Sequence, residues 1–95
     1  MDRRLSNLGL CNRARGLVSG EEMVCEYMAS SKVKYVFLAN DASENAKKKI
    51  RNKANFYNVE VDESFSSLDL SMAIGKVGRM VIGITNQNFL KILKK

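Results

Sequence analysis

Two uninterrupted apolar runs constrain the fold more than any other feature of the sequence. Residues 35–39 read YVFLA, and residues 80–84, at the centre of a stretch from Arg79 to Thr85, read MVIGI. Both runs have the length of a strand, and neither alternates with polar residues. A strand with one face in water does alternate, so these runs predict strands that are buried on both faces. The chain must therefore supply a covering layer for each side of a sheet.

Helix signals surround these two strands. Five positions combine a turn or capping residue with apolar residues at helical spacing, and each predicts a helix start. The first helix is expected to run to about Arg15 and to end at Gly16, and the third to run to about Tyr57. Leu17-Val18 and residues 59–61 are long enough only for short strands. The five predicted starts are Asp2, Ser19-Gly20, Ser43, Ser66 and Asn86.

The apolar stripes of these helices define the expected core. In each stripe, apolar residues recur every three or four positions, as on the buried face of an amphipathic helix. The stripes are Leu5, Leu8 and Cys11; Met23, Val24, Tyr27 and Met28; Ala46, Ile50, Ala54 and Tyr57; Leu68, Met72 and Ala73; and Phe89, Leu90 and Leu93. Helices that alternate with short buried strands predict the α/β class. We expect a single domain over residues 1–95, a three-layer α/β/α sandwich with a short mixed sheet.

The sequence is basic, with 16 Lys and Arg against 10 Asp and Glu and a formal net charge of +6. Such a charge favours a polyanionic partner, although basic domains are also common for reasons of solubility alone. Between residues 44 and 53, five cations accompany a single acid, Glu44. They either form the solvated face of the third helix or neutralise phosphates without reading sequence. The five are Lys47, Lys48, Lys49, Arg51 and Lys53.

The sequence lacks the residue type that enzymes and metal sites use most often. The chain has no His, which removes the commonest general base and the commonest zinc ligand. Cys11 and Cys25 form no CxxC pair, and we expect them to be reduced, small apolar residues of a cytoplasmic protein. No signal peptide and no membrane span are expected, because no apolar stretch is long enough. We therefore expect no catalysis, no cofactor, no metal and no small-molecule substrate.

Glycines at two turns offer a different kind of binding surface. Gly20 stands at a helix start, where a residue without a side chain lets a partner's backbone approach unpaired N–H groups. Gly75 and Gly78 flank a loop that carries Lys76 and is followed by Arg79. This loop follows a helix and lacks the spacing of a phosphate or dinucleotide loop. Taken alone, isolated glycines at such positions are usually explained by turn geometry.

Three segments of the chain resemble a known family. They are residues 17–22 (LVSGEE), 36–50 (VFLANDASENAKKKI) and 73–76 (AIGK). They are similar to the small bacterial YlxQ proteins, which belong to the superfamily of the archaeal ribosomal protein L-seven-Ae and its eukaryotic L-thirty-e relative. That superfamily binds kink-turn RNA, and the resemblance extends from Leu8 to Leu93. It implies the same α/β/α sandwich and a structured RNA partner, with ribosomal RNA and association with the ribosome as further expectations.

The resemblance also implies where RNA would bind. In the superfamily, a glycine turn and the start of the second helix grip the kinked backbone and two sheared G·A pairs. A loop after the fourth helix covers a flipped-out nucleotide. The matching positions here are Gly20, Glu21, Glu22 and Met23 at the helix start, Lys47 and Lys48 at the start of the third helix, and Gly75, Lys76, Val77 and Arg79 in the loop.

The helix start departs from the family pattern. Kink-turn binders have Asn-Glu-x-x-Lys or Lys-Gln-x-x-Lys after the glycine, whereas Glu22, Met23 and Glu26 stand at those positions here. A carboxylate in place of the lysine repels phosphate, by about 1 kcal/mol at 4 Å in water. The protein then either prefers another RNA shape or uses its basic helix more heavily. The alternative is a protein-interaction module with the same fold, whose acidic docking face would be Glu21, Glu22 and Glu26.

Overall fold

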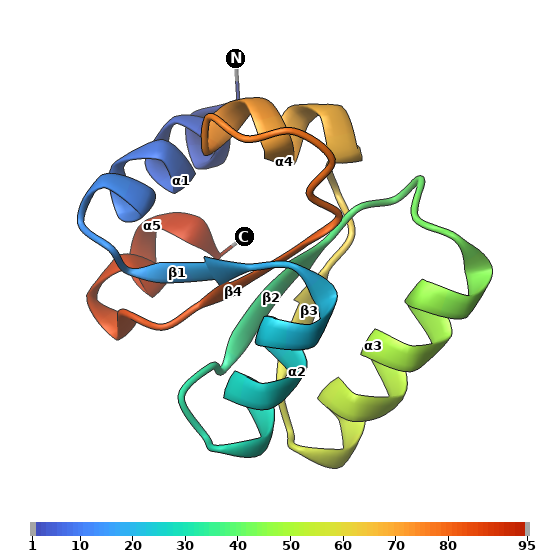
Figure 1. The fold of residues 1–95 in the computed structure, drawn as a ribbon. Helices are drawn as coiled ribbons and strands as arrows, with labels where there is room; N and C mark the ends of the chain where they lie inside the picture. Colours follow the sequence, from blue (N-terminus) through green and yellow to red (C-terminus); the bar gives the residue numbers. More distant parts are fainter. Residues whose placement is uncertain (1, 95) are drawn as a thin grey trace.

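The computed structural model describes residues 2–94, and in this part of the chain helices and short strands alternate (Figure 1). The apolar runs form β2 and β4, whose residues are all buried, as predicted. Met80, which was expected in the second buried run, is 41% exposed and lies before β4. The strands are β1 (Leu17–Ser19), β2 (Tyr35–Leu38), β3 (Glu60–Asp62) and β4 (Val81–Ile84). The helices are α1 (Arg3–Arg13), α2 (Glu21–Ala29), α3 (Glu44–Phe56), α4 (Ser67–Ala73) and α5 (Leu90–Leu93), and a 3-10 turn, η1 (Gln87–Phe89), precedes the last.

The strands form one mixed sheet in the order β1-β4-β2-β3. β4 is antiparallel to both of its neighbours, whereas β2 and β3 are parallel. Gly83 in β4 lies opposite Val18 on one side and Val36 on the other. Helices α1, α4 and α5 cover one face of the sheet, and α2 and α3 cover the other (Figure 1). The predicted three-layer α/β/α sandwich with a mixed sheet is confirmed.

The predicted helix caps are present in the structure. The side chains of Asp2, Ser43 and Ser66 accept hydrogen bonds from N–H groups of the first turn, at 2.8, 3.2 and 3.1 Å. Asn86 also acts as a cap, but what it caps is the 3-10 turn rather than an α-helix. α-Helical geometry begins only at Leu90, so the last helix is shorter than predicted.

Most of the predicted apolar stripes point into the core, and three side chains do not. Met23 is 45% exposed and lines a surface hollow at the start of α2, whereas Leu68 and Met72 are each 66% exposed. The expected inner face of α4 is therefore wrong, because Leu70 and Ile74 are buried in its place. The two pairs have the same four-residue spacing on opposite sides of a short helix. Packing against α1 selects the second pair.

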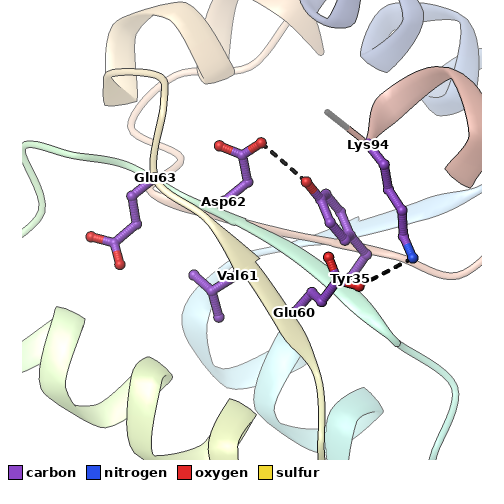
Figure 2. A pocket seen from close by; sticks show the side chains of 6 residues that line it. All are labelled: Tyr35, Glu60, Val61, Asp62, Glu63 and Lys94. Carbon is purple, nitrogen blue, oxygen red and sulfur yellow. Dashed lines mark hydrogen bonds and ion pairs between the residues drawn. The ribbon is translucent and has the colours of Figure 1, made fainter.

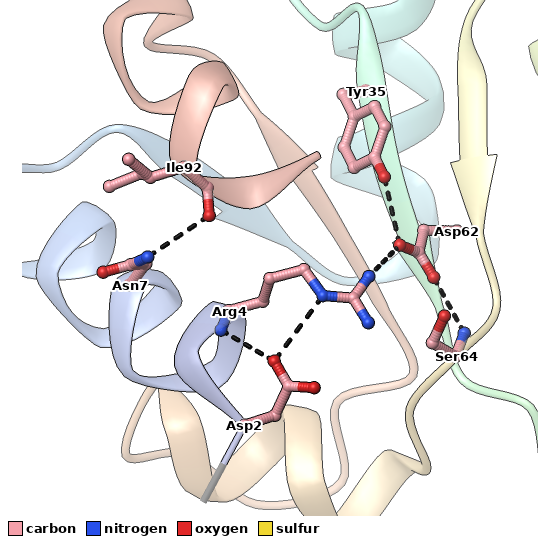
Figure 3. A network of polar contacts seen from close by, with 7 residues as sticks. All are labelled: Asp2, Arg4, Asn7, Tyr35, Asp62, Ser64 and Ile92. Atoms are coloured by element: carbon pink, nitrogen blue, oxygen red, sulfur yellow. Dashed lines mark hydrogen bonds and ion pairs between the residues drawn. The ribbon is translucent and has the colours of Figure 1, made fainter. Parts of the chain in front are cut away.

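A buried carboxylate, Asp62 at the end of β3, ties three elements together (Figure 3). Its Oδ2 accepts hydrogen bonds from Arg4 Nη1 in α1 at 2.6 Å and from the Tyr35 hydroxyl in β2 at 3.0 Å. Its Oδ1 accepts a hydrogen bond from the N–H of Ser64 at 2.9 Å. Burial alone raises the pKa of Asp62, but the hydrogen bonds from Ser64 and Tyr35 and the charge of Arg4 outweigh burial and lower it. Burial and the neighbouring carboxylate raise the pKa of Tyr35.

Candidate nucleic-acid interface

Three helices begin at one end of the sheet. β1, β2 and β3 run in the same direction, and each is followed by a helix, so α2, α3 and α4 start at that end (Figure 1). The loop from α4 to β4 lies there too, because β4 runs in the opposite direction. Helix N-termini carry partial positive charge and unpaired N–H groups. This end of the molecule is therefore suited to an anionic ligand.

Gly20 makes the turn from β1 into α2. Its φ is 99° and its ψ is 143°, a conformation that residues with side chains rarely adopt. Its N–H donates to the carbonyl oxygen of Val81 in β4 at 2.9 Å, which fixes the turn on the sheet. No side chain caps α2, so the N–H groups of its first turn are left for solvent or for a ligand. The turn therefore leaves the start of α2 open.

The Arg79 side chain lies beside this turn. A Cβ atom placed on Gly20 would be 3.6 Å from Arg79 Nη1. Arg79 lines a surface hollow together with Glu22, Met23 and Glu26 at the start of α2. Within residues 2–94, its Nε is buried without a hydrogen-bond acceptor, and its guanidinium makes no ion pair. Such a guanidinium can bind a ligand that supplies an anionic or hydrogen-bond-accepting group.

An ion pair joins the start of α2 to α3. Lys49 Nζ lies 3.0 Å from Glu21 Oε1, and this hydrogen bond raises the pKa of Lys49. Burial raises the pKa of Cys25 in α2, and the charges of Lys49 and Lys53 partly oppose that rise. Both lysines therefore lie near α2. Lys49 is not among the contact residues that the resemblance implies. Its spacing of four residues from Lys53 is the sequence signal that could have placed both lysines on the same side of α3.

Lys47 and Lys48 lie outside the hollow at the start of α2. Lys47 pairs with Glu44 of its own helix at 3.9 Å. The Arg51 hydrogen bond lowers the pKa of Glu63, and the charge of Lys47 adds to this effect, which places Lys47 near β3. The Lys48 side chain is exposed to solvent. The cations of α3 are thus divided between two flanks and an outer face.

The loop after α4 is open to solvent. Gly75 and Gly78 have φ values of 66° and 68°, and Lys76 and Val77 between them are exposed. Val77 is 93% exposed and, with side chains of α4, lines an apolar hollow. An apolar hollow thus adjoins this loop, and the charged hollow of Arg79 follows at its end.

A second polar hollow lies at the β3 edge of the sheet, and its charged side chains pair with other side chains of the protein (Figure 2). Lys94 Nζ donates a hydrogen bond to Glu60 Oε1 at 3.2 Å. Glu63 accepts two hydrogen bonds from Arg51, at 2.8 and 2.6 Å. Because its charged groups already have partners, we assign this hollow a structural role. Its lining residues are Tyr35, Glu60, Val61, Asp62, Glu63 and Lys94.

Residues 2–94 offer no metal site, since no three His, Cys, Asp or Glu side chains are grouped so as to hold a metal ion. Both cysteines are free thiols. Burial raises the pKa of Cys11 to about 11, so its thiol is not a reactive nucleophile. In the same part of the chain, no helix has the length and apolar character needed to cross a membrane.

The fold and this surface define a small α/β/α sandwich that presents helix starts, a glycine turn and a basic loop at one end. The chain belongs to the ribosomal protein L7Ae/L30e/S12e/Gadd45 family, whose model matches residues 3–94. It is 43% identical over 88 residues to the RNA-binding protein YlxQ of Enterococcus faecium, covering 93% of this chain and 84% of that protein. It is also 43% identical over 82 residues to YlxQ of Bacillus subtilis strain 168, covering 86% and 82%. The resemblance seen in the sequence is confirmed.

Solved structures show the same fold. A protein of unknown function from Bacillus halodurans C has a TM-score of 0.93 and 38% identity, over 98% of this chain and 94% of that one. The 15.5-kD RNA-binding protein of Giardia lamblia has a TM-score of 0.81 at 15% identity, over 94% and 77%. At 15% identity the second likeness bears on the fold alone.

Proposed function

We propose that the protein binds structured RNA at the end of the sheet where α2, α3 and α4 begin, and that it does so without catalysis. The observation that carries this proposal is Arg79, whose guanidinium has no ionic partner within residues 2–94 and lies beside the glycine turn that opens α2. The family and the two YlxQ relatives, which are named as RNA-binding proteins, support the same proposal.

Two kinds of contact act together at this surface. Arg79, Lys49 and the first-turn N–H groups of α2 meet the sugar–phosphate backbone, which positions the RNA. Glu22 and Glu26 are exposed in the same hollow and accept hydrogen bonds from base amino and imino groups. The remaining acid, Glu21, is paired with Lys49 and repels phosphate less than a free carboxylate does.

The preferred RNA is kinked or looped rather than a regular duplex. In an A-form duplex the base edges are hard to reach, whereas unstacked bases in loops and bulges are exposed. Val77 and Met72 present apolar surface beside the loop after α4, where an unstacked base can pack. We extend the proposal to kink-turn motifs, to ribosomal RNA and to a location in the cytoplasm. The bacterial relatives and the free cysteines support this extension.

A binding series tests the proposal. The purified protein is titrated with a kink-turn hairpin, a duplex of equal length and a single strand, each at several salt concentrations. The hairpin should bind most tightly. A plot of log affinity against log salt should be linear, with a slope that steepens by about 0.9 for each phosphate neutralised on a duplex. No binding to any of the three at low salt would overturn the proposal.

The carboxylates of Glu22 and Glu26 support a second candidate, docking of a protein with a basic surface. Arg79 in the same hollow weighs against it, because a basic partner would meet a guanidinium that no residue in the range 2–94 neutralises. If the RNA series gives no binding, this acidic hollow becomes the candidate docking face for a protein.

A further inference from the structure

Ser71 in α4 is an unusual residue for the interior of this protein. It is buried, with 5% exposure. Within residues 2–94, Asp62 is the only other buried polar residue. The Ser71 hydroxyl accepts a hydrogen bond from the N–H of Arg79 at 2.8 Å and donates one to the carbonyl oxygen of Arg79 at 3.1 Å. One side chain therefore holds both backbone polar groups of Arg79.

Few other hydrogen bonds hold the loop between α4 and Arg79. It begins at the end of α4, where the N–H of Lys76 donates to the carbonyl oxygen of Ser71 at 2.9 Å. A Cβ atom on Gly75 or Gly78 would meet nothing within 4 Å, so the backbone at both glycines lies open to solvent. Glycine-rich backbone loses more conformational freedom on ordering than other backbone does. The Ser71 hydroxyl therefore fixes the end of this open loop at Arg79, and the N–H of Ala39 holds the next residue, Met80, through a hydrogen bond of 2.8 Å to its carbonyl oxygen.

This attachment fixes the backbone from which the Arg79 side chain extends. Arg79 lies two residues before β4, and its Nη1 lies beside the Gly20 turn. An arginine that is already ordered in its bound position loses less entropy when a ligand binds. We infer that Ser71 is a positioning residue for RNA binding, whose hydroxyl holds Arg79 over the start of α2 before RNA arrives. This inference rests on the proposed function.

A double-mutant cycle separates positioning from a purely structural role. Ser71→Ala, Arg79→Ala and the double variant are compared with the wild type in affinity for the kink-turn hairpin and in stability to urea. If Ser71 acts through Arg79, Ser71→Ala should weaken RNA binding by about five-fold in the wild type. In the Arg79→Ala background it should leave affinity nearly unchanged, because the side chain that it positions is gone.

Asn86→Ala is the control. Asn86 caps the 3-10 turn by accepting a hydrogen bond from the N–H of Asn88 at 2.9 Å, and it follows β4 at the end of the sheet opposite to Arg79. Its loss should lower stability and leave RNA affinity unchanged. If Ser71→Ala does not fold, Ser71→Cys enters the same cycle, since it places a slightly larger thiol with weaker hydrogen bonds at the same position.

The outcomes are distinct. A loss of affinity with Ser71→Ala that disappears in the Arg79→Ala background supports the inference. An equal loss in both backgrounds, no loss in the wild type, or an equal loss with Asn86→Ala would overturn it and leave RNA binding standing. A wild-type protein that binds no RNA overturns the inference together with the proposed function.

Discussion

Charged and polar side chains in this protein are of two kinds. Some form hydrogen bonds or ion pairs with other groups of the protein, and others have no such partner within residues 2–94. Asp62 belongs to the first kind, since Arg4, Tyr35 and the backbone of Ser64 supply its hydrogen bonds. Arg79 belongs to the second kind, with a buried Nε that has no acceptor within residues 2–94. An unsatisfied buried polar group costs about 1–3 kcal/mol. A ligand that supplies the missing acceptor removes that cost, which is the residue-level reason for placing RNA at Arg79.

Gly20→Ala should destabilise the protein more than Gly78→Ala does. Residues with side chains already occupy φ values near that of Gly78 (68°), namely Arg15 at 57°, Ser31 at 62° and Asn58 at 59°. Alanine at 78 should therefore cost about 1 kcal/mol. The φ of 99° and ψ of 143° at Gly20 lie in a region used almost only by glycine, so alanine there should cost about 2–3 kcal/mol. Urea unfolding measures both, and equal losses would show that the turn relaxes freely.

Asp62 should make stability depend on pH in the acid range. Its pKa in the folded protein lies below the ordinary value of 3.8, so near that pH the unfolded chain binds more protons. The stabilisation is present above about pH 5 and is lost as the pH falls through the lowered pKa. Asp62→Asn should cost about 3 kcal/mol at pH 7, because it breaks the buried pair with Arg4. The loss of stability caused by Asp62→Asn should become smaller as the pH falls from about 5 to 2.

The control for this pH series is Glu26→Gln, which changes an exposed carboxylate of α2. Urea unfolding at each pH gives the free energy of unfolding for the three proteins. A deficit of Asp62→Asn that stays constant as the pH falls would show that lost packing, and not the carboxylate charge, sets its stability.

At the scale of elements, the sequence predicted what depends on local pattern and missed what depends on packing between elements. β2 and β4 were predictable because an unbroken apolar run reports burial of both faces. The inner face of α4 was not, because Leu68 with Met72 and Leu70 with Ile74 have equal spacing. The contact of Ser71 with Arg79 spans eight residues across a loop and leaves no periodic signal.

The same distinction applies to α3 and the candidate site. The cationic character of the helix was evident from its composition, but the flank that meets α2 depends on how the two helices pack. That packing places Lys49 against Glu21 at 3.0 Å and leaves Lys48 on the outer face. The residues alone suggested the glycine turn before α2 as a candidate surface, and family resemblance strengthened that suggestion. The place of Lys49 beside this turn emerged only from the structure.

Lys49→Ala should weaken RNA binding more than Lys48→Ala, although each removes one charge from α3. The first substitution also leaves the Glu21 carboxylate unpaired at the start of α2, where it repels phosphate. We expect a loss of about five-fold for Lys49→Ala and about two-fold for Lys48→Ala. Stability should hardly change, because exposed ion pairs contribute little. Glu21→Gln in the Lys49→Ala background should restore most of the affinity, and equal losses would contradict a role for this pair.

At the scale of the whole molecule, the strand directions separate two ends of the sheet. α2, α3 and α4 start at one end, and the loop from α2 to β2 lies at the other (Figure 1). The protein measures 30 × 26 × 22 Å along its principal axes. At physiological salt, charges are screened over about 8 Å. Cations at the far end should therefore contribute little to a phosphate bound beside Arg79.

Removing two cations from either end should consequently have unequal effects on RNA binding. Lys76→Ala with Arg79→Ala changes the proposed surface, and Lys32→Ala with Lys34→Ala changes the loop before β2. Each double variant lowers the formal net charge from +6 by the same amount. The first should reduce the slope of log affinity against log salt by roughly 1.4–1.8 and weaken binding about ten-fold or more, because each phosphate contact contributes about 0.7–0.9.

The second double variant should keep the slope nearly unchanged and lose less than about two-fold in affinity, since its charges are screened from the site. The second should unfold at nearly the same urea concentration as the wild type, because Lys32 and Lys34 are exposed. The first should be at least as stable as the wild type, because Arg79→Ala removes a buried Nε that has no acceptor within residues 2–94. Fluorescence anisotropy with the kink-turn hairpin, at salt concentrations from about 50 to 300 mM, gives the slope of log affinity against log salt for each protein. Equal reductions would mean that RNA is drawn by net charge alone, and the end of the sheet beside Arg79 would then lose its assignment as the binding surface.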